Sequence, residues 1–185
     1  MAMDEIFIQD FEIECRAHVL AVAYAYKHII PVETSVKYIN FNNHPGIKAI
    51  IEKEISERYG KTMTLDMALL FKSKPQAVPV IHHDVMSQNL SEVALNIPIY
   101  GCEGSMMQWF DGKYDAYEMY TDSTKTVRHV ELTWKTEPVL LFEKEIVRPS
   151  LVNILKPHRA INPNNHERMM MSLRFSPGLE FRPLD

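Results

Sequence analysis

Cysteine is scarce in this chain, and its scarcity excludes several classes of small protein. Two cysteines, Cys15 and Cys102, occur among 185 residues and lie far apart in the sequence. Such a pair makes neither a disulfide framework nor the closely spaced ligands of a zinc ribbon. A reducing compartment, the cytoplasm, is therefore the simpler expectation.

Long apolar runs and concentrated positive charge are also lacking. The apolar stretch from Ala17 to Tyr26 is too short to span a bilayer, is interrupted by His18, and follows acidic residues where a secretory signal carries positive charge. The net charge is −4, with lysine and arginine interspersed among acids rather than gathered in a basic stripe. We therefore expect no export, no membrane association and no binding to duplex nucleic acid.

Apolar residues are plentiful enough for one hydrophobic core. At 185 residues and 46% hydrophobic composition, the chain fits a single domain without internal repeats. We expect residues 1–62 to supply a supporting strand and helix, and residues 63–177 to form a β-rich core. Isoleucines recur at helical spacing after Asn43, which predicts a helix capped by Asn43 and stopped by Gly60.

The sequence from residue 63 onward has the pattern of short strands separated by turns. Apolar runs alternate with proline, glycine, aspartate and asparagine, as is typical of a β-barrel or sandwich. The expected strands include Ile6–Ile8, Ala77–Ile81, Val93–Ile99, Lys113–Thr121, Val127–Trp134 and Pro138–Phe142. The predicted fold class is mostly β with flanking α-helix, and an exposed edge strand of such a sheet can pair two copies into a homodimer.

The tripeptide His82-His83-Asp84 is the most informative motif. Two residues apart in a strand, His82 and Asp84 share one face, whereas His83 points away from it. Read with His158, they supply two imidazoles and a carboxylate, the ligand set that non-haem Fe(II) oxygenases use with coordination positions left open. A His-x-Asp tripeptide alone has low specificity, and surface polar residues in a turn are the alternative.

His158 and Arg168 provide the downstream half of the motif. His158 closes the apolar run Pro149–Pro157, so we expect it at the end of a strand, followed by a proline and asparagine turn. In the next expected strand, Arg168, Met170, Ser172 and Arg174 alternate with apolar residues and share one face. A guanidinium pairs with a carboxylate through two hydrogen bonds, so Arg168 suits the far end of a dicarboxylate co-substrate.

These motifs together resemble the 2-oxoglutarate- and Fe(II)-dependent oxygenase superfamily, in particular its small stand-alone members from phages and marine microbes. The resemblance covers roughly residues 75 to 175 and depends on the order and spacing of the segments. The segments that carry it are His82-x-Asp84, Ala94-Leu95-Asn96-Ile97-Pro98-Ile99, Pro157-His158-Arg159, and Arg168 with Ser172-Leu173-Arg174-Phe175.

The resemblance implies a double-stranded β-helix, the cupin-like jelly roll, supported by N-terminal helix. It also implies that His82, Asp84 and His158 hold Fe(II) and that Arg168 holds the distal carboxylate of 2-oxoglutarate. The reaction it implies is hydroxylation of a small metabolite or a peptide side chain, with 2-oxoglutarate converted to succinate. Some family branches have serine two positions after the arginine, where this chain has Met170.

Several assignments stay open at the level of sequence. Asn96 and Arg174 are candidates for binding the co-substrate, but Asn96 equally suits a local backbone contact and Arg174 a surface position. Arg168 could instead pair with Glu167 on an edge strand. A zinc-dependent hydrolase with the same ligands and a non-catalytic cupin-like binding module are the alternative functions.

Overall fold

The computed structural model describes residues 7–29, 36–84, 92–120 and 128–181. Strands dominate this part of the chain, and the helices all precede residue 60. The helices are α1 (Arg16–Tyr26), the short 3-10 helix η1 (Phe41–Asn43) and α2 (Pro45–Tyr59). The strands are β1 (Ile8–Asp10), β2 (Val36–Tyr38), β3 (Thr64–Ser73), β4 (His82–Asp84), β5 (Val93–Tyr100), β6 (Met106–Asp111), β7 (Tyr114–Tyr120), β8 (Arg128–Trp134), β9 (Val139–Glu145), β10 (Ser150–Asn153), β11 (His158–Ile161) and β12 (Arg168–Ser176).

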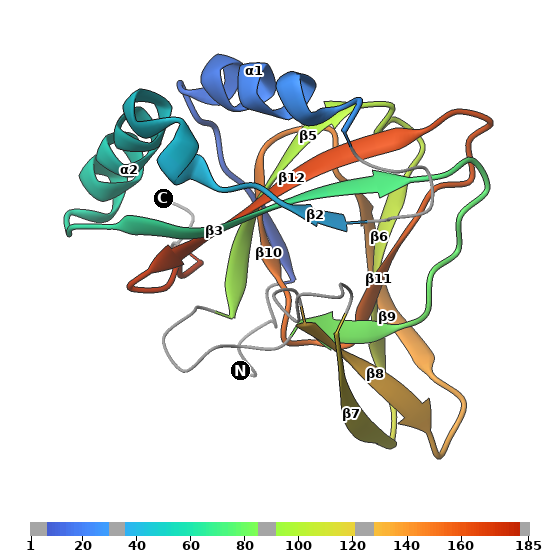
Figure 1. Cartoon of the computed structure of the whole chain (residues 1–185). Helices are drawn as coiled ribbons and strands as arrows, with labels where there is room; N and C mark the ends of the chain where they lie inside the picture. The colour runs from blue at the N-terminus through green and yellow to red at the C-terminus, as the bar shows by residue number, and fades with distance from the viewer. Residues whose placement is uncertain (1–6, 30–35, 85–91, 121–127, 182–185) are drawn as a thin grey trace.

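The strands form two antiparallel sheets of six strands each. The first sheet has the order β1-β10-β5-β12-β3-β2, and the second has the order β7-β8-β4-β11-β6-β9. Strands β3 to β6 alternate between the two sheets, and so do strands β9 to β12, so the chain winds around both sheets as a double-stranded β-helix (Figure 1). The predicted fold class is confirmed by this topology.

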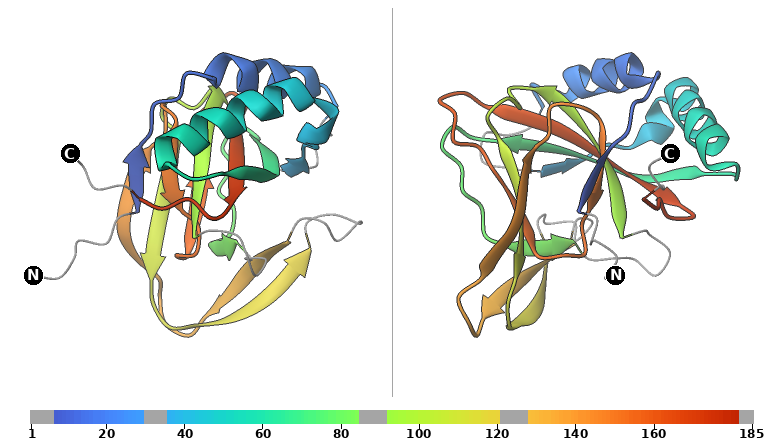
Figure 2. Two further views of the ribbon diagram at one scale, coloured as in Figure 1. Left: turned by 90° about the vertical axis from the view of Figure 1, so that its left-hand side faces the viewer. Right: turned by 180° about the vertical axis from the view of Figure 1, so that it is seen from behind.

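The first sheet is buried on both faces because helices cover its outer side. Both α1 and α2 cross this side (Figure 2). Ile51 and Ile55 of α2 and Val19 of α1 pack there against the alternate residues Met171 and Leu173 of β12. The opposite face of β12 looks into the barrel, so this strand is buried over nearly its whole length.

α2 begins and ends with different kinds of signal. Pro45 occupies the first turn, where its missing N–H is not needed. Gly60 ends the helix in the left-handed conformation at φ 64°, as the sequence predicted. The predicted cap at Asn43 is wrong: Asn43 belongs to η1, and the cap position is His44, whose side chain makes no capping bond.

The bounds of three short strands differ from those predicted from the sequence. Residues 78–81 are not in a strand, and β4 begins at His82 instead of ending there. Likewise, β10 ends at Asn153, and His158 begins β11 after a turn in which the Asn153 side chain accepts from two backbone N–H groups. Ile6 lies outside the described residues, and β1 runs over Ile8–Asp10. No described helix has the length and apolar character required to cross a membrane.

The stability of the fold depends on the core between the helices and the first sheet. Leu70 of β3 is fully buried there, whereas Ile50 of α2 is 42% exposed. Leu70→Ala is expected to lower the free energy of unfolding by about 2–5 kcal/mol, because it removes buried methyl groups and leaves a cavity. Ile50→Ala serves as the control with a change below about 1 kcal/mol. Urea denaturation checks both, and equal losses would contradict this assignment of the core.

Candidate metal centre and co-substrate cavity

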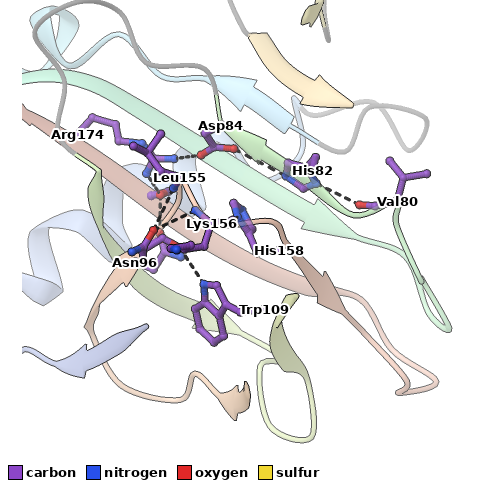
Figure 3. Close-up of polar contacts among 11 residues, drawn as sticks. Val80, His82, Asp84, Asn96, Trp109, Leu155, Lys156, His158 and Arg174 are labelled. Carbon is purple, nitrogen blue, oxygen red and sulfur yellow. Dashed lines mark hydrogen bonds and ion pairs between the residues drawn. The ribbon is translucent and has the colours of Figure 1, made fainter. Parts of the chain in front are cut away.

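Two histidines and an aspartate meet on adjacent strands of the second sheet. His82 of β4 lies directly opposite His158 of β11 in the antiparallel register. Opposite residues share a face, so both imidazoles and Asp84 point into the barrel. One ligand atom from each of the three side chains lies within 4.8 Å of the others, and the two imidazole centroids are 4.7 Å apart (Figure 3).

The hydrogen bonds of the two imidazoles fix which nitrogen faces the site. Nδ1 of His82 lies 3.1 Å from the Val80 carbonyl, and Nδ1 of His158 lies 2.8 Å from the Lys156 carbonyl. A carbonyl only accepts, so Nδ1 of each ring carries the proton and Nε2 carries the lone pair. Both rings therefore present Nε2 as a metal ligand, held in orientation by the backbone.

Asp84 is held between a cation and an imidazole. Its Oδ2 accepts from Nη2 of Arg174, and its Oδ1 lies 3.7 Å from Nε2 of His82. Burial alone raises the pKa of this carboxyl, but Arg174 and the two imidazoles outweigh burial and lower the pKa below its ordinary value. Asp84 is therefore ionised and has one oxygen directed toward the histidines.

His158 is the most deeply buried of the three ligands. Burial, with a smaller contribution from His82, lowers the pKa of its imidazole to about 4. A neutral imidazole is the form that binds a metal. His158 is consequently ready to act as a ligand well below neutral pH. The donor set of two neutral imidazoles and one carboxylate fits Fe(II) and also Zn(II).

A cavity of about 340 Å³ extends from these three residues and has several basic residues in its walls. Arg168, at the start of β12, lines it and is only 6% exposed. Its Nε has no hydrogen-bond partner, and no ion pair joins Arg168 to a described aspartate or glutamate. Its side chain interacts with the thiol of Cys102, whose pKa is raised by burial. Lys72 also lines the cavity but is neutralised by Glu167 at 2.9 Å. Arg168 is thus a buried cation in the cavity wall with no acidic partner among the described residues.

A chain of side chains connects the cavity wall to the metal ligands. Arg174 donates from Nη1 to the hydroxyl of Ser172, which donates to Oδ1 of Asn96. All three residues line the cavity (Figure 3 shows Asn96 and Arg174). Met170 lies between Arg168 and Ser172 on the same face and contributes only apolar surface.

All six residues singled out in the sequence line this one cavity. They are His82, Asp84, His158, Arg168, Asn96 and Arg174. The alternative pairing of Arg168 with Glu167 is wrong, because Glu167 pairs with Lys72 and β12 is a central strand. The alternative surface position of Arg174 is also wrong, since its side chain is buried.

Among the other features of the site, some were predicted from the sequence and others were not. His83 points away from the cavity and lies against the ring of Tyr114, as the strand alternation predicted. Ser172 was placed on the correct face, but its link to Asn96 depends on the pairing of β12 with β5. No local sequence pattern predicts that residues 71–79 contribute to the cavity wall, because the packing of the two sheets brings them to the cavity.

Comparison with known proteins rests on structure alone, since no protein-family model and no curated sequence matches the chain. EvdMO1 is 13% identical, with a TM-score of 0.50 over 93% of this chain and 47% of its own. SnoK, a non-haem α-ketoglutarate-dependent carbocyclase from nogalamycin biosynthesis, is 13% identical, with a TM-score of 0.49 over 90% of this chain and 76% of its own. HygX from Streptomyces hygroscopicus, solved with nickel and 2-oxoglutarate bound, is 8% identical, with a TM-score of 0.49 over 92% of this chain and 81% of its own.

The topology of the two sheets decides the fold type. The chain has the double-stranded β-helix fold, and EvdMO1 shares this fold. At such low identity, the likeness establishes the fold alone and leaves the chemistry to the residues of this chain.

Protonation of the buried His158 is expected to make the metal-free protein sensitive to acid. The pKa of His158 is about 4 in the folded state and about 6.5 when unfolded, so the unfolded state binds the proton first as the pH falls. Stability is therefore lost between pH 6.5 and 4, by about 2 kcal/mol from pH 7 to pH 5. Urea denaturation in the presence of a chelator measures this loss, and His158→Gln should remove that part of it. An equal pH dependence in the variant would contradict the assignment.

Removal of Arg174 is expected to leave the Asp84 carboxylate buried without a cation. Arg174→Met should lower the free energy of unfolding of the metal-free protein by about 3 kcal/mol. A divalent metal then replaces the missing charge, so the thermal shift on adding metal should be larger in the variant than in the wild type. Lys74→Met is the matched control, because Lys74 is a cavity-lining cation that is exposed. Equal stability of the two variants would contradict the role given to Arg174.

Proposed function

We propose that this protein is an Fe(II)- and 2-oxoglutarate-dependent oxygenase that hydroxylates a small metabolite or a peptide side chain. The observation that carries the proposal is the combination, in one cavity, of a His-Asp-His group and a buried arginine without an anionic partner. A metal site alone fits several reaction classes. The buried arginine favours a co-substrate with a carboxylate at its far end.

The proposed metal ligands are Nε2 of His82, Nε2 of His158 and the free oxygen of Asp84. Three protein ligands on one side of an ion leave the other positions for small molecules. Arg174 acts here as a positioning residue, because its bond to one carboxylate oxygen of Asp84 directs the other toward the imidazoles. Lys156 and Val80 act similarly through their carbonyls, which hold the two rings.

The proposed site for the distal carboxylate of 2-oxoglutarate is Arg168. Burial of an unpaired guanidinium is costly, and a bound carboxylate offsets that cost through paired hydrogen bonds. Met170 and Met107 give the cavity apolar walls, which keep water away from this ion pair and strengthen it. Direct contacts of Asn96 and Arg174 with the co-substrate remain predictions.

When bound, Fe(II) and 2-oxoglutarate supply the activation of dioxygen: one oxygen atom enters the substrate, and the other enters succinate as 2-oxoglutarate loses carbon dioxide. The residues of this chain bind and orient these partners. Asp84 and the two imidazoles would hold the ion from one side. Arg168 orients the co-substrate by its far end, and the remaining volume of the cavity is left to the substrate.

Anaerobic titration with Fe(II) and 2-oxoglutarate tests this proposal. The wild type is expected to develop a visible metal-to-ligand charge-transfer band, and Asp84→Ala should lose it. Arg168→Ala should keep metal binding but weaken 2-oxoglutarate binding about 100-fold, because the carboxylate loses its buried partner. Lys74→Ala, the matched control at an exposed cavity-lining cation, should change the affinity by less than about threefold.

Other results would point to the alternative functions. Folded protein that binds Fe(II) and gives no band with 2-oxoglutarate would contradict the oxygenase. Activity with zinc in the absence of oxygen, unaffected by Arg168→Ala, would indicate a hydrolase. Failure to bind any divalent metal would favour a non-catalytic binding module.

A further inference from the structure

The inner face of the second sheet continues past the metal ligands onto β8 and β7. Residues directly opposite each other in antiparallel strands share a face. His158 lies opposite Trp109 of β6 on one side and opposite His82 of β4 on the other. The same row continues from His82 to Glu131 of β8, and from Glu131 to Tyr117 of β7. One row of side chains therefore crosses five strands and includes both imidazoles.

Exposure to solvent increases along this row. Trp109 is fully buried and His158 is 4% exposed, whereas Glu131 is exposed and Tyr117 is 55% exposed. β8 and β7 lie at the end of the molecule opposite α1 (Figure 1). A molecule that approaches the imidazoles from solvent along this face thus passes Tyr117 and Glu131 first.

The two ends of the site differ in charge. Among the described residues that line the cavity, Asp84 is the only acid, and it is paired with Arg174. Arg168 makes the far part of the cavity cationic. Glu131 places a second carboxylate on the face of the ligands, directly beside His82. A dicarboxylate is therefore attracted toward Arg168 and disfavoured beside Glu131.

We propose that Glu131 is a specificity-determining residue that selects a substrate with an ammonium or guanidinium group. This inference rests on the proposed function for the position of the reacting carbon, and on the row of residues for the position of the cation. Neighbouring strands lie about 4.8 Å apart, so a cation between Glu131 and Tyr117 lies roughly 5–10 Å along the sheet from His82. The extended side chains of lysine and arginine have lengths in this range.

The pair formed by Glu131 and Tyr117 suits a cation. A carboxylate has about four acceptor sites, so Glu131 can bind an incoming ammonium beside any hydrogen bond that it already makes. Tyr117 is next in the row, and the face of an aromatic ring attracts a cation. Asp115, two residues from Tyr117 on the same face, is paired with Lys135 at 2.6 Å. Glu131 is the better placed of these two acids, because it lies directly beside His82.

Binding of a matched pair of probes tests this inference. Nα-acetyl-lysine methylamide and Nα-acetyl-norleucine methylamide have side chains of similar length, and only the lysine probe carries an ammonium. Calorimetric titration of the metal-free wild type is expected to show about tenfold tighter binding of the lysine probe, since an exposed ion pair and a cation–π contact each contribute a few-fold. Glu131→Gln should reduce this preference to about threefold, because the ion pair is lost. Glu57→Gln, the matched control, removes the same charge from an exposed carboxylate of α2 and should keep the full preference.

The titration needs neither iron nor 2-oxoglutarate, so its outcome is separate from that of the charge-transfer test. A preference that depends on Glu131, found without a charge-transfer band, would support the cation site and contradict the oxygenase. Cadaverine, a free diamine, distinguishes the source of the cation: binding as tight as that of the lysine probe supports a free amine as substrate, and weaker binding supports a peptide side chain. Equal affinities of the wild type for the lysine and norleucine probes, no measurable binding of the lysine probe, or a full preference in Glu131→Gln would overturn the proposal.

Discussion

The antiparallel pairing of β11 with β4 is the constraint on which the site depends. It sets His158 directly opposite His82, and the period of two then places Asp84 on the same face. A shift of one residue would turn one imidazole out of the barrel and leave two ligands instead of three. β11 is fixed from its other side by pairing with β6, so the register does not depend on the short β4 alone.

The two buried arginines of the barrel differ in whether an acid neutralises them. Asp84 and Arg174 neutralise each other and complete a hydrogen-bonded chain through Ser172 to Asn96. Arg168, six residues away on the same strand, has no acidic partner among the described residues, and its side chain interacts with the thiol of Cys102. The proposed binding of a co-substrate carboxylate at Arg168 depends on this difference, because a bound carboxylate would supply the negative charge that Arg174 already receives from Asp84.

The sequence predicts some of these features well and others poorly. The alternation along β12 was clear, because the polar residues Arg168, Ser172 and Arg174 lie at even spacings from one another within its nine residues and are separated by apolar residues. The bounds of β4 and β11 were misplaced, since each has three or four residues and their partners are distant in sequence. The bond between Arg174 and Asp84 joins residues 90 positions apart, and no local pattern indicates it.

A crystal structure of the protein with Fe(II) and 2-oxoglutarate, prepared without oxygen, tests the central claim most directly. The account predicts one ion bound by Nε2 of His82, Nε2 of His158 and one oxygen of Asp84, with the distal carboxylate of 2-oxoglutarate on the guanidinium of Arg168. An ion bound elsewhere, or a co-substrate that leaves Arg168 without an anion, would contradict it.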